Sequence, residues 1–133
     1  MTETADKQFW LDRPLTPRFP KITIEIFIFS LLLLLAVVSR FYNLGERVIS
    51  HDEGLHVYYS WKYSEGLGYS HAPGTHGPLQ FHLLALSYIR FGDSDFTARL
   101  PHALTSVLTI LMVWKWRRYL GRAGALVAAG LML

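Results

Sequence analysis

Apolar and polar residues alternate along the chain in blocks that define four hydrophobic segments. Residues 22–40 and 97–114 are each close to the roughly 20 residues that cross the hydrocarbon core of a bilayer. Residues 79–89 are shorter and are interrupted by Gln80 and His82, whereas residues 123–133 begin like a further span and reach about half of its length. The pattern predicts an all-α integral membrane protein with two full transmembrane helices and a truncated third.

The distribution of charge orients these segments. Residues 1–21 contain four Lys and Arg residues, and residues 115–122 contain four with no acid, whereas residues 41–98 contain three against six acidic residues. Because basic residues accumulate on the cytoplasmic side, we expect a cytoplasmic tail at 1–21, an external loop at 41–96 and a basic cytoplasmic turn at 115–122. This topology, in the inner (cytoplasmic) membrane, requires residues 79–89 to lie in the membrane interface rather than to cross it.

Two helices are expected within the external loop, near 51–65 and 78–90. Ser50 followed by Glu53 forms a capping-box pattern, and Gly66 stands where a helix C-cap favours glycine. Pro78 is a favoured first-turn residue for the second helix. Both helices are predicted to lie on the membrane surface.

Composition narrows the functional classes. With 51% hydrophobic residues, the chain is too apolar for an ordinary soluble domain, and with no cysteine it can form neither a disulfide nor a thiolate metal site. The net charge of +3 is small, and we expect membrane lipids rather than nucleic acid as partners. Glu25 lies inside the first span, where it can reach back to the surface or pair with Lys21.

The chemistry of the loop centres on two adjacent carboxylates, Asp52 and Glu53. As acids in a first helical turn they are stabilised by the helix dipole without any catalytic role. At a membrane surface among aromatic residues they would be partly desolvated, which suits a general base. Arg99, near the outer mouth of the second span, can reach the surface or bind an anionic headgroup.

Four histidines lie within 26 residues of the same loop, at positions 51, 56, 71 and 76. Histidines that face water or lipid headgroups are commoner than a dedicated metal site, so we expect no metal site. The sequence does not decide whether a divalent cation is required. No other cofactor is indicated.

The order of these motifs resembles the N-terminal part of GT-C fold membrane glycosyltransferases. The segments concerned are "HDE", the aromatic helix after it, "HGPLQF" and "FGDSDFTARLP", each placed relative to the first two spans. The similarity covers roughly residues 22–133. It is nearest to glycosyltransferase family 39, which includes the protein O-mannosyltransferases, and extends to the lipid A aminoarabinose transferase.

The resemblance implies inverting transfer of a sugar from a polyprenyl-phosphate donor to an external acceptor. Asp52 matches the family's leading acid, the base that deprotonates the acceptor, and Glu53 would position the acceptor or assist. Arg99 matches the arginine of "ARLP" and would bind the donor phosphate. His76 stands where the relatives carry a lysine for the same role, and it is charged only part of the time near neutral pH.

Full-length relatives contain many more spans than this chain. One expectation is therefore a portion of a larger transferase, with little activity of the 133 residues alone. The alternative is a small non-catalytic membrane subunit, derived from such an enzyme, that packs on other membrane protein subunits through its helices and its external loop.

The topology is tested with single cysteines, since the chain has none of its own. A cysteine at Gly74 should react with a membrane-impermeant maleimide on intact cells, and one at Gly121 only after permeabilisation. The reverse labelling pattern would contradict the predicted orientation.

Overall fold

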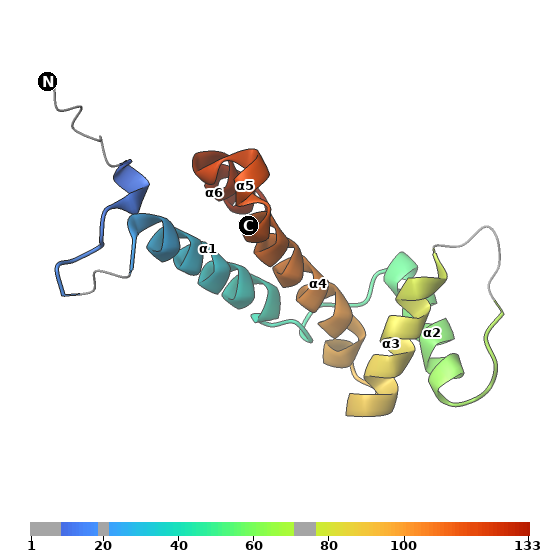
Figure 1. Ribbon diagram of the computed structural model, residues 1–133. Coiled ribbons are helices and arrows are strands. Elements are labelled where there is room, and N and C mark those ends of the chain that lie inside the picture. Colours follow the sequence, from blue (N-terminus) through green and yellow to red (C-terminus); the bar gives the residue numbers. More distant parts are fainter. Residues whose placement is uncertain (1–8, 19–21, 71–76) are drawn as a thin grey trace, which may run out of the picture. The chain divides into compact units, whose positions relative to one another are not determined.

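The computed structural model describes residues 9–18, 22–70 and 77–133, and over these residues it contains helices and no strand (Figure 1). The elements are a 3₁₀ turn η1 (Trp10–Asp12) and the helices α1 (Ile24–Phe41), α2 (His51–Ser64), α3 (Pro78–Phe91), α4 (Asp95–Lys115), α5 (Arg117–Leu120) and α6 (Arg122–Leu131). The chain divides into two compact units: unit 1 is Met1–Ser39 with Val107–Leu133, and unit 2 is Arg40–Ser106. Each unit is described by itself.

Two helices are long and apolar enough to cross a membrane. α1 has 18 residues and α4 has 21, and less than a third of the residues in the apolar part of each are buried. This confirms the expected all-helical class with two helices of spanning length. α6, at 10 residues, is apolar but shorter. The positions of α2 and α3 at the membrane surface stay predictions.

The core of unit 1 is formed where α1, α4 and α6 meet. Phe29 and Ile110 are buried in it, and the ring of Trp114 lies 4.4 Å from that of Phe29, centroid to centroid. Ala125 and Ala129, one turn apart on α6, are also buried there. Small side chains at helix contacts let backbones approach closely, which is how helices associate where apolar lipid gives no hydrophobic driving force.

Glu25 is a buried carboxylate within α1, with 6% of its surface exposed. Its oxygens lie 3.6 Å from Nε of Arg117 and 3.4 Å from Nε of Arg122. The guanidinium of Arg117 also stacks on the ring of Trp114, 4.1 Å from its centroid. The carboxylate therefore has two cationic partners in the basic turn. Lys21, the partner expected from sequence, lies outside the described residues.

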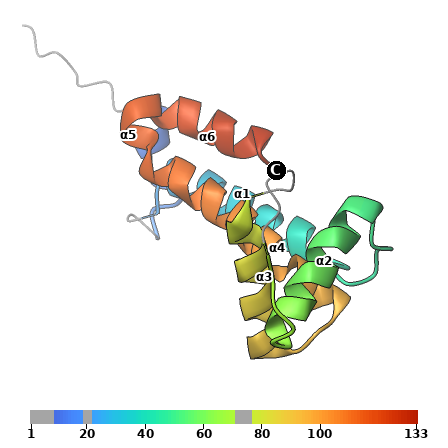
Figure 2. The ribbon, with the colours of Figure 1, turned by 90° about the vertical axis from the view of Figure 1, so that its right-hand side faces the viewer.

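The basic segment after α4 is more ordered than the expected turn, because four of its residues form α5 (Figure 2). Gly121 separates α5 from α6 with a φ of +73°, a left-handed conformation that disfavours other residues. Arg122 also binds the carboxylate of Asp12, in the segment before α1 that was predicted to be a cytoplasmic tail. A cysteine for topology labelling is therefore better placed at Tyr119, which is 73% exposed.

Unit 2 is built on the pair α2 and α3, which lie side by side (Figures 1 and 2). The buried face of α3 repeats at helical spacing, with Phe81, Leu84, Ala85 and Tyr88. Phe81 packs on the ring of His56 from α2, with centroids 5.0 Å apart. These contacts bury one face of α3, which at 14 residues is too short to span a bilayer.

A proline in α4 is accommodated by a side chain from α3. Pro101 has no N–H, so the carbonyl of Thr97 four residues earlier lacks its helical donor. The hydroxyl of Ser87 donates to that carbonyl at 2.9 Å, and both residues are buried. Because Pro101 leaves the Thr97 carbonyl without a helical donor, this carbonyl is available to link the start of α4 to α3 through Ser87.

The packing of α6 yields a stability prediction. Ala129 is fully buried, so Ala129→Leu should force overpacking and lower stability by about 1–3 kcal/mol. Ala123→Leu, the same change at an exposed position of α6, is the matched control and should have little effect. Thermal unfolding in detergent, followed by helical circular dichroism, compares the two. Equal midpoints would contradict the packing described for unit 1.

Candidate functional site

The site begins at the first turn of α2, where the predicted capping box is present. The hydroxyl of Ser50 accepts a hydrogen bond from the backbone N–H of Glu53 at 3.3 Å, and the Glu53 carboxylate accepts one from the N–H of Ser50 at 3.4 Å. Together these bonds satisfy two of the donors that a helix start leaves unpaired. They fix α2 to begin at His51 and place Asp52 and Glu53 in its first turn.

Glu53 joins α2 to α4 through Arg99. Nε of Arg99 donates to one carboxylate oxygen at 2.6 Å and Nη2 donates to the other at 3.1 Å. Such a bidentate pair is stronger and more directional than a single charged hydrogen bond. The Arg99 side chain is 12% exposed and that of Glu53 is 30% exposed, so solvent screens the pair only in part.

The third contact of Arg99 is with the loop after α1. Its Nη1 donates to the backbone carbonyl of Leu44 at 3.0 Å. Asn43, just before, has a φ of +52°, which asparagine tolerates better than most residues. Gly45, just after, lies so close to Phe96 that an added Cβ would stand 3.4 Å from its backbone nitrogen. The "NLG" turn is a signal in the sequence that could have indicated this contact, which we did not predict.

A hydroxyl network holds the start of α4 and so the position of Arg99. The N–H of Ser94 donates to the Thr97 hydroxyl at 2.9 Å, and the N–H of Thr97 donates to the Ser94 hydroxyl at 3.2 Å. The Thr97 hydroxyl lies 2.7 Å from the carbonyl of Gly92 as well. These bonds cap the helix at Ser94, five residues before Arg99, and so fix the backbone from which the Arg99 side chain projects.

The pairing sets the charge of Glu53. The hydrogen bond from Arg99 is the largest cause that lowers the pKa of the Glu53 carboxyl from its ordinary value of 4.5, while partial burial opposes this. The carboxyl is therefore ionised throughout the neutral range. Its oxygens accept hydrogen bonds from Arg99 and from the Ser50 N–H, so the carboxylate links the start of α2 to α4.

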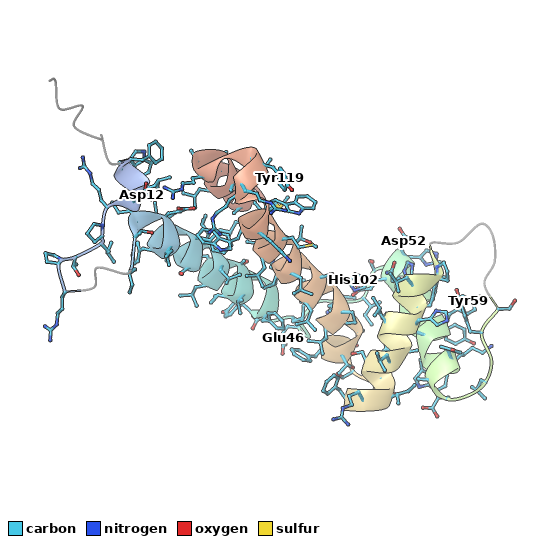
Figure 3. All side chains as sticks on the ribbon, in the orientation of Figure 1. Asp12, Glu46, Asp52, Tyr59, His102 and Tyr119 are labelled. Atoms are coloured by element: carbon cyan, nitrogen blue, oxygen red, sulfur yellow. The ribbon has the colours of Figure 1, made fainter. Side chains whose placement is uncertain are left out.

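Asp52 is in a different environment although it is the adjacent residue. Its side chain is exposed, and its backbone carbonyl lies 2.9 Å from Nδ1 of His56 (Figure 3). We expected the nearby aromatic residues to bury this carboxylate in part. Within unit 2 they do not, because they lie on later turns of α2. Its desolvation would have to come from lipid or from a bound substrate.

Of the two candidate phosphate ligands, the structure describes only Arg99. His76 lies outside the described residues. Arg99 is placed with three of its N–H donors bound, and a guanidinium has five, which leaves donors for a further acceptor. Within residues 9–18, 22–70 and 77–133, no group of three or more His, Asp or Glu residues is arranged to hold a metal ion.

The fold and the site together define a helical membrane protein with an acidic pair, one member of which is held by an arginine. Residues 75–133 match the model of the dolichyl-phosphate-mannose-protein mannosyltransferase family. The match covers less than half of the chain, and it includes Arg99 but neither Asp52 nor Glu53. No curated protein and no solved structure matches the chain. The resemblance to protein mannosyltransferases is confirmed over this segment, and the finer relations to glycosyltransferase family 39 and to the aminoarabinose transferase stay predictions.

The Glu53–Arg99 pair gives unit 2 a specific dependence on pH. Because the folded-state pKa of Glu53 is depressed, its contribution to stability is full above the ordinary value of 4.5 and is lost as the pH falls through the lower folded value. The thermal midpoint should therefore drop on acidification below about pH 4.5, and Glu53→Gln should be destabilised at pH 7 and less sensitive to acid.

The control for this experiment is Glu65→Gln, at an exposed residue just after α2, which removes the same charge. It should unfold like the wild type at both pH 7 and pH 4. If Glu53→Gln lost no stability at pH 7, the ion pair would not hold α2 to α4.

Proposed function

We propose that the chain forms part of a membrane glycosyltransferase that transfers a sugar from a polyprenyl-phosphate donor to an acceptor outside the cell. The observation that carries the proposal is the Glu53–Arg99 pair. It joins the "HDE" segment to the "ARLP" segment, which lies within the part of the chain that matches the mannosyltransferase family. The two motifs lie 46 residues apart in sequence and belong to one site in unit 2.

Asp52 is the proposed general base. An inverting displacement needs a base beside the acceptor hydroxyl and a cation beside the leaving phosphate. Asp52 is exposed at a rigid helix start, so an acceptor can approach it, whereas the carboxylate of Glu53 is held by Arg99. The capping box and the ion pair keep the first turn of α2 in place, which fixes the backbone from which Asp52 projects.

Arg99 is the proposed cation on the phosphate side. Its bonds to Glu53 and to the Leu44 carbonyl hold the guanidinium plane while donors remain for a phosphate oxygen. His76 is proposed to assist as a second donor. A preorganised cation stabilises charge on the leaving group without having to rearrange during the reaction.

Replacing the proposed base tests this function. In the longest natural form of the protein, Asp52→Asn should reduce sugar transfer by about a hundredfold or more, because general bases contribute roughly 10²–10⁴-fold. The assay measures transfer from a polyprenyl-phosphate-linked sugar in isolated membranes, normalised to the amount of inserted protein. Glu46→Gln, at an exposed acid outside the site, is the matched control and should retain activity.

Unchanged transfer by Asp52→Asn would exclude Asp52 as the base. Transfer that does not depend on the presence of this protein at all would favour the non-catalytic subunit. That second candidate has its own observation, since α3 exposes apolar side chains at Leu79, Leu86 and Ile89 that a partner helix could cover. Purification in mild detergent would then recover a second protein in fixed stoichiometry.

A further inference from the structure

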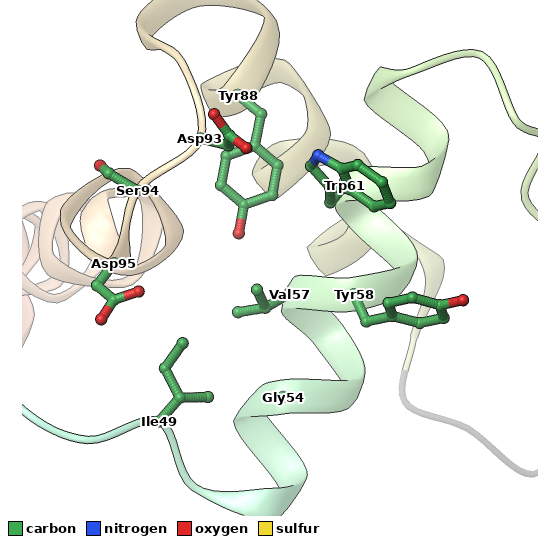
Figure 4. A pocket seen from close by; sticks show the side chains of 9 residues that line it. All are labelled: Ile49, Gly54, Val57, Tyr58, Trp61, Tyr88, Asp93, Ser94 and Asp95. Carbon is green, nitrogen blue, oxygen red and sulfur yellow. The ribbon is translucent and has the colours of Figure 1, made fainter.

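A cavity in unit 2, whose lining includes neither Asp52 nor Arg99, carries features that the proposed reaction does not use. It has a volume of about 370 Å³ and lies between α2, the end of α3 and the start of α4 (Figure 4). Its lining residues are Ile49, Gly54, Val57, Tyr58, Trp61, Tyr88, Asp93, Ser94 and Asp95. This volume is within the range of small-molecule sites.

The phenol of Tyr88 is the most unusual group in this cavity. The residue is 6% exposed, and its hydroxyl is buried with no hydrogen-bond partner among the described residues. Figure 4 shows the hydroxyl directed toward the centre of the cavity, between Val57 and Asp95. A buried tyrosine hydroxyl ordinarily has a partner, so its absence indicates that the cavity receives a polar group.

The electrostatics of the cavity favour a cation. Asp93 and Asp95 supply two carboxylates, and no Lys or Arg lines it. Burial, together with these carboxylates and Glu53, raises the pKa of Tyr88 to about 12, so the phenol is neutral and its oxygen can accept a hydrogen bond. Water would satisfy the hydroxyl but would not neutralise the carboxylates. Asp95, in the first turn of α4, is stabilised by the helix dipole. This effect does not account for the buried Tyr88 hydroxyl that has no hydrogen-bond partner among the described residues.

The aromatic walls and the absence of a metal cluster narrow the kind of cation. Trp61 lines the cavity, and an aromatic face attracts organic ammonium groups. The ring of Tyr58, also in the lining, lies 5.9 Å from Nζ of Lys62. The described residues provide no group of three His, Asp or Glu ligands for a metal ion. An ammonium group can donate to a carboxylate of the lining and to the Tyr88 oxygen, while apolar carbon atoms contact Ile49 and Val57.

We propose that this cavity is a binding site for a primary ammonium group, held by Asp93, Asp95 and the hydroxyl of Tyr88. The site is independent of the proposed sugar transfer. The group could belong to the headgroup of an aminophospholipid, since the cavity lies at the first turn of the spanning helix α4, or to a small amine in solution. The chemistry of recognition is the same for both sources.

The test uses the full chain with Trp10, Trp114 and Trp116 changed to phenylalanine, which leaves Trp61 as the reporter. In phosphatidylcholine nanodiscs, ethanolamine should shift the emission of Trp61 saturably, and ethylene glycol, which lacks the amine, should not. In a second arm, nanodiscs containing phosphatidylethanolamine are compared with those of phosphatidylcholine alone. A response in either arm supports the site, and the responding arm identifies the source.

Three variants separate binding from folding. Tyr88→Phe should weaken the response about 2–10-fold, as for the loss of one hydrogen bond. Without ligand it should unfold at a higher temperature than the wild type, because a buried unpaired hydroxyl has been removed. Asp93→Asn and Asp95→Asn should weaken binding at least as much, whereas Glu65→Gln, an exposed acid outside the cavity, should bind as the wild type does.

No response to either amine source would overturn the proposal, as would an equal response to ethylene glycol. The proposal would also fail if Tyr88→Phe, Asp93→Asn and Asp95→Asn all bound like Glu65→Gln. None of these outcomes depends on sugar transfer, so failure of this site and failure of the proposed function can be distinguished.

Discussion

The bidentate pair between Glu53 and Arg99 is the constraint on which the candidate site depends. Oε2 of Glu53 accepts a hydrogen bond from the Ser50 N–H and so closes the capping box of α2, while both carboxylate oxygens bind Arg99. A single side chain therefore caps one helix and holds it to another. Arg99 in turn holds the loop after α1 through the carbonyl of Leu44. The loop, α2 and α4 therefore converge on one guanidinium within unit 2.

The rest of each unit shows how polar groups within apolar helices are satisfied by neighbouring segments. Ser87 supplies the donor that Pro101 removes from α4, and Arg40 at the end of α1 donates to the hydroxyl of Ser106 at 2.7 Å. In unit 1, Glu25 meets Arg117 and Arg122. An unpaired polar group costs several kcal/mol in hydrocarbon, so these contacts specify which helix faces meet as well as stabilising them.

The helices were predictable from the sequence because their signals are local. Apolar length indicated α1 and α4, Ser50 with Glu53 indicated the start of α2, and Pro78 indicated the start of α3. The contacts between them were not predictable, because they join residues far apart in sequence. Arg99 was recognised as a candidate, yet nothing near it in the chain indicates Glu53 or the Leu44 carbonyl. Asp93 and Asp95 stand in a motif that we noted, but only the fold places them beside Tyr88.

The two adjacent acids of α2 show why a fold is needed to assign roles to a motif. Successive residues of a helix point about 100° apart, so neighbouring side chains meet different surroundings. Glu53 faces α4 and its charge is neutralised by Arg99, whereas Asp52 faces outward and remains exposed. A carboxylate that is fully paired is a poor base, since its lone pairs are occupied and its protonated form is disfavoured. The pairing of one acid therefore leaves the other as the member of the motif that is free to act on a substrate.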